Sequence, residues 1–240
     1  MSHVNVRLIV SFVVGLAILG CARAPEPAMK DSSKVNAATS SADGWRPLFD
    51  GTSLAGWHVY RQTGTPANWR AVDGTIERVA DGGDLVTDEQ FANFDLTLDW
   101  KVAPGGNSGI VYRVADTGEE TYETGPEMQI LDDTRHPDGK SPLTSAGSNY
   151  GLYPAPRGVV KPAGEWNSIR LLVNGNHVEH WMNGVKVVEY ELHSPEWNQK
   201  VAASKFKQWP AYGQAASGRL ALQQHGAPVN FRNIRIQVLP

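Results

Sequence analysis

One short segment of this chain gathers acidic and amide side chains at a spacing suited to chemistry. In the run from Glu127 to Asp132, polar and apolar residues alternate, so a strand there would place Glu127 and Gln129 on one face and the apolar residues between them on the core face. Asp132 is out of phase by one residue, and a β-bulge after Gln129 would turn it onto the polar face. Two acids and an amide would then share a groove. For an isolated match of this kind, solvated acids on an outward strand edge are the commoner explanation.

Two further segments could bring polar groups to the same groove. In the candidate strand 107–113, Arg113 falls on the face opposite Ile110 and Tyr112, so its guanidinium could face the groove of Glu127. Near the C-terminus, Gln223 and His225 share one face of a strand and could converge there. A histidine at the end of a turn, hydrogen-bonded to backbone, is the equally simple interpretation of His225.

Other kinds of chemistry find no support in the sequence. No catalytic serine motif, phosphate-binding glycine loop or His-x₃-His zinc pair is present. His177 and His180 would lie on opposite faces of a strand, which makes them a poor metal pair. The single cysteine excludes an intramolecular disulfide framework. With 22 Lys and Arg against 25 Asp and Glu, the net charge of -3 leaves no basic excess for nucleic acid.

The elements that must position these residues are predicted to be short strands. Residues 94–102 alternate apolar and polar without a fault, and Asn174-Gly175 and Asn183-Gly184 are typical two-residue hairpin turns joining the runs 168–173, 177–182 and 185–190. A further pair of strands is expected at 219–225 and 231–238. The 240 residues include 24 glycines and 15 prolines, which favours tight turns over long helices.

Together these patterns predict an all-β fold, a two-sheet jelly-roll sandwich, with a closed barrel as the alternative. Six apolar residues are expected in the core: Phe94, Leu96, Leu98, Trp100, Ile234 and Ile236. Two long segments, 132–161 and 195–216, break the strand pattern. Long loops inside a compact domain usually build a site.

The N-terminus is predicted to be an export signal. An apolar run from Leu8 to Leu19 follows Arg7 and ends in Ile18-Leu19-Gly20-Cys21, which resembles a bacterial lipobox. We therefore expect a lipoprotein signal peptide over 1–20, acylation of Cys21 and a disordered tether over 21–44, with the sandwich domain over 45–240. The expected location is the cell envelope, lipid-anchored to the outer membrane and facing the periplasm.

An alternative cleavage site follows Ala22-Arg23-Ala24. Pro25 would then come directly after the cut, where the peptidase tolerates proline poorly. The lipidated form is therefore the prediction.

Several motifs together resemble the 3-keto-disaccharide hydrolase family, and the similarity extends from Trp45 to Pro240. No single motif is decisive, but their order and spacing are specific: Leu48-Phe49-Asp50-Gly51-Thr52-Ser53-Leu54-Ala55-Gly56-Trp57, Asn107-Ser108-Gly109-Ile110 with Arg113, Glu127 to Asp132, Gly164-Glu165-Trp166-Asn167, Ser204-Lys205-Phe206, Leu222-Gln223-Gln224-His225-Gly226 and Phe231-Arg232-Asn233-Ile234. The resemblance implies a concanavalin A-like jelly roll of the lectin and glucanase type.

The resemblance also implies a reaction. Related glucanases carry E-x-D-x-x-E on their acidic strand, whereas this chain has Gln129 and Asp132 at the second and third positions, which argues against the ordinary two-carboxylate mechanism. Family members are associated with glycosides already oxidised to a ketone at C3. The ketone acidifies the C2 proton, so the C1 substituent can leave by elimination through an enolate, or with net hydrolysis.

Such a site needs a base near C2, a cation or donor at the C3 oxygen and an acid for the leaving oxygen. The resemblance implies Glu127 or His225 as base and Asp132 as an orienting or acid group. The enolate would be stabilised by Arg113, by Lys205, or by a divalent metal ion held by Glu127 and His225. The expected substrate-binding residues are Asn107, Gln129, Tyr150, Tyr153, Trp209 and Gln223, of which the aromatic ones could stack on pyranose rings or simply pack in the core.

Two other classes of function remain open at this point. A non-catalytic carbohydrate-binding protein would use the same sheet and aromatic residues without a convergent acid, base and cation. A structural envelope lipoprotein would present only a protein-binding face and would have no affinity for sugars. In the enzymatic reading the partner is an oligosaccharide or glycoside substrate, and the membrane is reached only through the N-terminal lipid.

Overall fold

The computed structural model describes residues 43–240. The predicted signal peptide, the predicted lipidation site Cys21 and all but the end of the predicted tether lie outside the described residues. Among the described residues, no helix is long and apolar enough to cross a membrane.

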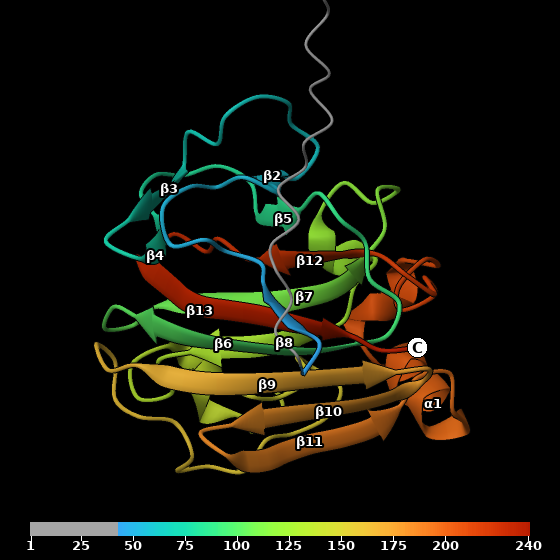
Figure 1. Ribbon diagram of the computed structural model, residues 1–240. Helices are drawn as coiled ribbons and strands as arrows, with labels where there is room; N and C mark the ends of the chain where they lie inside the picture. Colours follow the sequence, from blue (N-terminus) through green and yellow to red (C-terminus); the bar gives the residue numbers. More distant parts are fainter. Residues whose placement is uncertain (1–42) are drawn as a thin grey trace, which may run out of the picture. The chain divides into compact units, whose positions relative to one another are not determined.

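Within residues 43–240, two antiparallel sheets make up the fold (Figure 1). The eight-stranded sheet has the order β11-β10-β9-β6-β13-β4-β3, with β1 also paired to β13. Its strands are β1 (Trp45–Pro47), β3 (Trp69–Val72), β4 (Thr75–Arg78), β6 (Phe94–Val102), β9 (Asn167–Asn174), β10 (His177–Met182), β11 (Val185–Glu191) and β13 (Val229–Val238). The five-stranded sheet has the order β2-β5-β12-β7-β8. Its strands are β2 (Trp57–Val59), β5 (Leu85–Thr87), β7 (Asn107–Val114), β8 (Glu127–Leu131) and β12 (Arg219–Leu222). The predicted jelly-roll sandwich is confirmed.

Local patterns located most of the long strands. The faultless alternation over 94–102 coincides with β6. In the β10–β11 hairpin, Asn183 and Gly184 form the predicted two-residue turn with φ of 49° and 82°, and two positive φ angles are what a type I′ turn requires. The β9–β10 turn is displaced by one residue from the prediction, because Asn174 still pairs with His177 and the loop is Gly175-Asn176.

The predicted pairing of the last two strands is wrong. β12 ends at Leu222 and lies in the five-stranded sheet, whereas β13 pairs with β6 in the other sheet. Each strand has one apolar face, and that pattern fits face-to-face packing in two layers as well as side-by-side pairing in one. Only the tertiary structure distinguishes the two arrangements.

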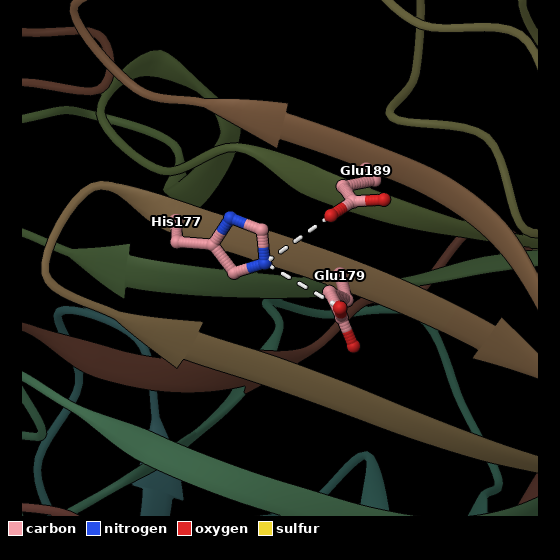
Figure 2. Close-up of side chains that lie close together, drawn as sticks. All are labelled: His177, Glu179 and Glu189. Carbon is pink, nitrogen blue, oxygen red and sulfur yellow. Dashed lines mark hydrogen bonds and ion pairs between the residues drawn. The ribbon is translucent and has the colours of Figure 1, made fainter.

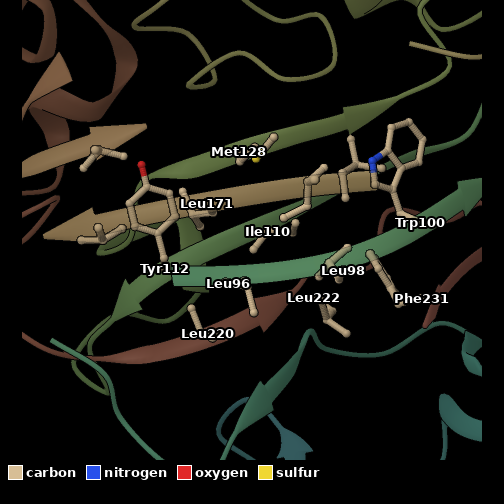
Figure 3. Packing of buried hydrophobic residues seen from close by; sticks show 14 of the residues in the cluster. Leu96, Leu98, Trp100, Ile110, Tyr112, Met128, Leu171, Leu220, Leu222 and Phe231 are labelled. Carbon is tan, nitrogen blue, oxygen red and sulfur yellow. The ribbon is translucent and has the colours of Figure 1, made fainter. Parts of the chain in front are cut away.

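The core lies between the two sheets (Figure 3). Leu96, Leu98 and Trp100 point inward from β6, and Ile110 and Tyr112 approach them from β7. All six residues predicted for the core are buried, each no more than 2% exposed. One continuous apolar layer therefore fixes the five-stranded sheet, which carries the groups described below.

The two long segments contain short helices instead of bare loops. The segment 132–161 holds the 3₁₀ helix η2 (Pro137–Lys140), and the segment 195–216 holds α1 (Pro195–Ala203) and η3 (Lys205–Gln208). The helix α1 begins where the Ser194 hydroxyl accepts a hydrogen bond from Trp197 N at 3.1 Å, with Pro195 in the first turn. Another 3₁₀ helix, η1 (Thr121–Glu123), precedes β8.

Candidate active site

A cavity of about 280 Å³ lies on the face of the five-stranded sheet that points away from the core. Its walls come from the ends of strands and from all three 3₁₀ helices. The residues that line it are Asn107, Tyr122, Glu127, Gln129, Asp138, Tyr150, Lys205, Trp209, Gln223 and His225. The alternation of β8 therefore places Glu127 and Gln129 together on the polar face, as predicted.

Glu127 is the most perturbed acid of the cavity. Its side chain is 6% exposed and lies across Gly109 of the neighbouring strand β7, where a Cβ atom would overlap Oε1 of Glu127. Gln223 is hydrogen-bonded to the carboxyl group. Burial raises the pKa of Glu127 to about 8, against the attraction of Lys205, which lowers it. Near neutral pH this carboxyl group can therefore both accept and donate a proton.

Lys205 brings a positive charge to the cavity from the start of η3. Its Nζ lies 4.5 Å from the ring centroid of Tyr150 and 5.8 Å from that of Tyr122. Cation–π contacts of this kind hold an ammonium group in place while leaving its hydrogen-bond donors free for a ligand. The ammonium group is thus positioned to stabilise negative charge developing on a bound molecule.

A second carboxylate comes from η2. Asp138 Oδ2 accepts a hydrogen bond from the Tyr150 hydroxyl at 3.3 Å. Burial raises the pKa of Tyr150 to about 12, with the charge of Asp138 adding to the effect. Tyr150 therefore stays neutral and can serve as a hydrogen-bond donor or stacking surface.

The remaining wall is formed by the segment that follows β12. Gln223 and His225 both line the cavity, so their predicted common orientation is confirmed. The His225 ring lies edge-on to His136, with centroids 6.3 Å apart. On the neighbouring strand β7, Oδ1 of Asn107 is buried and has no hydrogen-bond partner among the described residues, so it can accept a hydrogen bond from a hydroxyl group of a ligand.

Asp132 does not reach the cavity. The pairing of β7 with β8 runs without a register shift from Asn107↔Leu131 to Val111↔Glu127, so the bulge expected after Gln129 is not formed. Asp132 Oδ2 accepts from Gly105 N at 2.7 Å, and Oδ1 accepts from Thr134 N at 3.0 Å. The carboxylate therefore caps backbone amides at the end of β8, which is a structural position.

Arg113 is also displaced from the predicted groove. A bulge in β7 sets Tyr112 and Arg113 opposite the single residue Leu220, and Arg113 has a φ of 52°. The extra residue shifts the phase of the strand. The guanidinium group is buried and donates to the carbonyl oxygens of Ala92 and Gly175, at 2.8 and 2.7 Å.

Tyr153 belongs to the core and does not line the cavity. It is 8% exposed and stacks on Tyr190, with ring centroids 4.7 Å apart. Tyr190 in turn stacks on Trp197 of α1 at 5.2 Å. For this residue, packing explains the aromatic side chain.

Metal-ligating side chains also gather on β10 and β11 of the eight-stranded sheet, away from the cavity. Over residues 43–240, the one group of three or more His, Cys, Asp or Glu ligand atoms within 4.8 Å is His177, Glu179 and Glu189 (Figure 2). Lys186 Nζ lies 2.6 Å from Glu189 and 3.3 Å from Glu179, so its charge already compensates these carboxylates. His180 points the other way into the core, as expected. Its Nδ1 donates a hydrogen bond to Gly147 O at 3.0 Å, and its Nε2 is hydrogen-bonded to the Tyr112 hydroxyl at 3.2 Å.

Sequence reasoning missed two cavity residues and one residue behind them. Asp138 lies in a segment recognised only as a long, Pro- and Gly-rich stretch, and Tyr122 lies in a short helix without any motif. Asp84 is buried beneath the cavity rim, where its carboxyl group accepts hydrogen bonds from Thr121 and from Gln224 N. None of the three carries a local signal, because each becomes significant only through contacts with distant segments.

The fold and the cavity define a concanavalin-like jelly-roll sandwich with acidic, basic and aromatic groups gathered over one sheet. The chain belongs to the family of 3-keto-alpha-glucoside-1,2-lyase-like domains, whose family model matches residues 44–237. It is 37% identical over 230 residues to a protein of Bacteroides thetaiotaomicron VPI-5482 named 3-keto-disaccharide hydrolase, covering 82% of this chain and 79% of that protein. The resemblance seen in the motifs is thereby confirmed.

Solved structures agree with this assignment. A candidate glycosyl hydrolase from Parabacteroides distasonis ATCC 8503 matches with a TM-score of 0.78 and 34% identity, covering 83% of this chain and 95% of that one. A second candidate glycosyl hydrolase of the same organism matches with a TM-score of 0.65 and 32% identity, covering 81% of this chain and 99% of that one.

Proposed function

We propose that this protein is an enzyme that cleaves 3-keto-glycosides, 3-keto-disaccharides among them, by removing the proton on C2 and eliminating the C1 substituent. The observation that carries the proposal is the buried carboxyl group of Glu127, set in a cavity beside the ammonium group of Lys205. The names of the relatives point to the same class of substrate.

The cavity contains a group for each requirement of the reaction. Glu127 is the proposed base, since its raised pKa makes its carboxylate a stronger base than a solvated one. It takes the C2 proton, and the C2–H electron pair forms an enolate with the C3 carbonyl group. The ammonium group of Lys205 stabilises the charge on the C3 oxygen.

The second half of the reaction breaks the bond between C1 and the glycosidic oxygen. The enolate electrons form the C1=C2 double bond, the leaving oxygen takes a proton, and the products are an unsaturated 3-keto-sugar and an alcohol. His225 is the proposed donor of that proton, with Asp138 as the alternative. Addition of water across C1=C2 would complete a net hydrolysis.

A divalent metal ion is the alternative to Lys205 as the group that stabilises the enolate. The donor set would be Glu127, His225 and the unpartnered Oδ1 of Asn107, and carboxylate, imidazole and amide oxygen suit a divalent cation. When bound, such an ion would supply positive charge to the C3 oxygen. To test the site, the protein is dialysed against a chelator, and its thermal unfolding is then measured with and without added Mg²⁺, Ca²⁺, Mn²⁺ or Zn²⁺. A rise in the unfolding temperature with one of these ions in wild type, and no such rise in Asn107→Ala, supports the site.

The burial of Glu127 also bears on the alternative of a non-catalytic carbohydrate-binding protein. Such a protein needs hydrogen bonds and aromatic surface, and nothing in binding requires a carboxyl group held where ionisation is unfavourable. A binding protein would retain 3-keto-sugars without releasing products.

The decisive experiment compares a 3-keto-disaccharide with its unoxidised parent. We expect cleavage of the oxidised sugar only. With deuterium at C2, elimination predicts a primary isotope effect where proton removal limits the rate, or otherwise loss of the label to solvent. Full retention of the label, together with equal cleavage of the parent sugar, would show an ordinary glycosidase and refute the mechanism.

We also propose export to the cell envelope with a lipid on Cys21, on the basis of the lipobox-like sequence alone. Mass spectrometry of the mature N-terminus tests this. A peptide that begins at an unmodified Pro25, or a Cys21→Ser variant that still fractionates with membranes, would refute it.

A further inference from the structure

A second and larger pocket, of about 560 Å³, adjoins the cavity that holds Glu127. The two share the wall residues Tyr122, Gln223 and His225. The larger pocket is otherwise lined mainly by polar groups, among them Arg61, Gln62, Asp84, Glu119, Glu120 and Gln224. The two hollows therefore form a continuous binding surface with chemically different halves.

The outer wall of the larger pocket is held in place by hydrogen bonds between two loops. The single proton of the Tyr60 hydroxyl is shared between the carbonyl oxygens of Ala115 and Gly118, at 2.9 and 3.0 Å. Arg61, which has a φ of 57°, donates from Nη1 to Gly118 O at 2.7 Å. These bonds fix the loop that carries Arg61 and Gln62 to the loop that carries Glu119 and Glu120, so the wall is preorganised for a ligand.

Asp84 connects this wall to the shared residues. Its Oδ2 accepts from the Thr121 hydroxyl, next to Tyr122, and its Oδ1 accepts from Gln224 N at 2.8 Å, between Gln223 and His225. The carboxyl group is 7% exposed. One buried side chain thus sets the positions of all three residues at the border of the two hollows.

We infer that the larger pocket is the subsite for the leaving group and that it takes a hydroxyl-rich sugar. The inference rests on the proposed function. Glu127 and Lys205 line only the smaller cavity, so the oxidised ring that loses its C2 proton belongs there. The glycosidic oxygen then lies at the border, beside His225, and the second ring meets amide and charged groups that hydrogen-bond to hydroxyls.

Gln62 and Glu120 are the residues that determine the specificity of this subsite. Neither side chain is hydrogen-bonded to any residue between 43 and 240, so truncation leaves the loops intact. Both lie outside the smaller cavity. Gln199→Ala and Glu165→Ala are matched controls, since both side chains are exposed and line neither hollow.

The test compares kcat/KM for a 3-keto-disaccharide and for the methyl glycoside of the same 3-keto-sugar. We expect Gln62→Ala and Glu120→Ala each to lower the value for the disaccharide by about 10-fold, the scale of one lost polar contact, and that for the methyl glycoside by less than about 2-fold. The controls should change neither. Equal losses on both substrates, or no loss on the disaccharide, would overturn the subsite.

A failure of the subsite can be separated from a failure of the proposed function. If neither 3-keto-glycoside is cleaved, the proposed function is refuted. The subsite is then judged by titrating the unoxidised disaccharide into wild type and the Gln62→Ala/Glu120→Ala variant by isothermal calorimetry. Binding weakened by about 10-fold or more in the double variant supports the subsite, and undetectable or equal binding overturns it.

Discussion

Replacing Glu127 by Gln should make the protein more stable at alkaline pH while abolishing most of its activity. Burial raises the pKa of Glu127 from 4.5 to about 8 in the folded chain. A folded-state pKa above the unfolded value means that folding favours the protonated carboxyl group. Its stabilising effect is complete below the unfolded value and is lost as pH rises through about 8.

The size of the effect follows from these two values. From about pH 5 to about pH 9 the wild-type protein should lose roughly 4 kcal/mol through this one group, at about 1.4 kcal/mol per pH unit. Gln cannot ionise, and it keeps the size of the side chain and the capacity to hydrogen-bond Gln223. The difference in unfolding free energy between Glu127→Gln and wild type should therefore grow by that amount over this range.

Urea unfolding at a series of pH values measures the difference directly. Glu165→Gln, which removes an exposed carboxylate, is the matched control. In the same variants, kcat on a 3-keto-disaccharide should fall by about 10²–10⁴-fold for Glu127→Gln only. Parallel stability curves for Glu127→Gln and wild type would show that the carboxyl group is not perturbed and would refute the electrostatic argument.

Four other substitutions give distinct outcomes. In Gly109→Ala the new Cβ overlaps the Glu127 carboxylate, so steady-state kcat/KM should fall by about 10-fold or more; an unchanged value would show that the carboxylate can move without loss. Lys205→Met removes the charge that lowers the pKa of Glu127. We expect kcat to fall by about 10²-fold and the midpoint of the pH–rate profile to move to higher pH. An unchanged midpoint would contradict the electrostatic interaction between Lys205 and Glu127. Asp132 caps backbone amides outside the cavity. Asp132→Asn should therefore lower the unfolding free energy by about 1–3 kcal/mol and leave kcat within about 2-fold of wild type. A large loss of kcat would show that Asp132 has a catalytic role. Leu98→Ala, at a position 2% exposed, should cost about 2–5 kcal/mol in denaturant unfolding.

The burial of Glu127 favours the reactivity of the site and lowers the stability of the fold at high pH. A buried carboxyl group that lies across β7 weakens the folded state at high pH, and the sandwich compensates with its large apolar core. Such a trade of stability for reactivity is common in active sites. The Glu127→Gln experiment measures the gain in unfolding free energy at high pH and the loss of kcat in one variant.

Much of the fold could be read from the sequence because the signals are local. The alternation over 94–102 and the Asn183-Gly184 turn depend on residues that are neighbours in the chain. Alternation along β8 predicts that Glu127 and Gln129 share a face, and alternation after β12 predicts the same for Gln223 and His225. All four residues line the cavity. Motif similarity added Lys205, which no periodicity identifies.

The tertiary structure decided what local patterns leave open. The apolar face of a strand does not show whether the strand pairs within a sheet or packs across the sandwich. The sequence therefore predicts a pairing of β12 with β13 that the structure does not contain. The bulge that turns Arg113 away arises from the register between β7 and β12, and the regular register of β7 with β8 keeps Asp132 out of the cavity. Asp138 and Tyr122 come to the cavity from two short helices, η2 and η1, that carry no motif. The raised pKa of Glu127 arises from its burial in the folded chain, because desolvation depends on packing through space and not on sequence spacing.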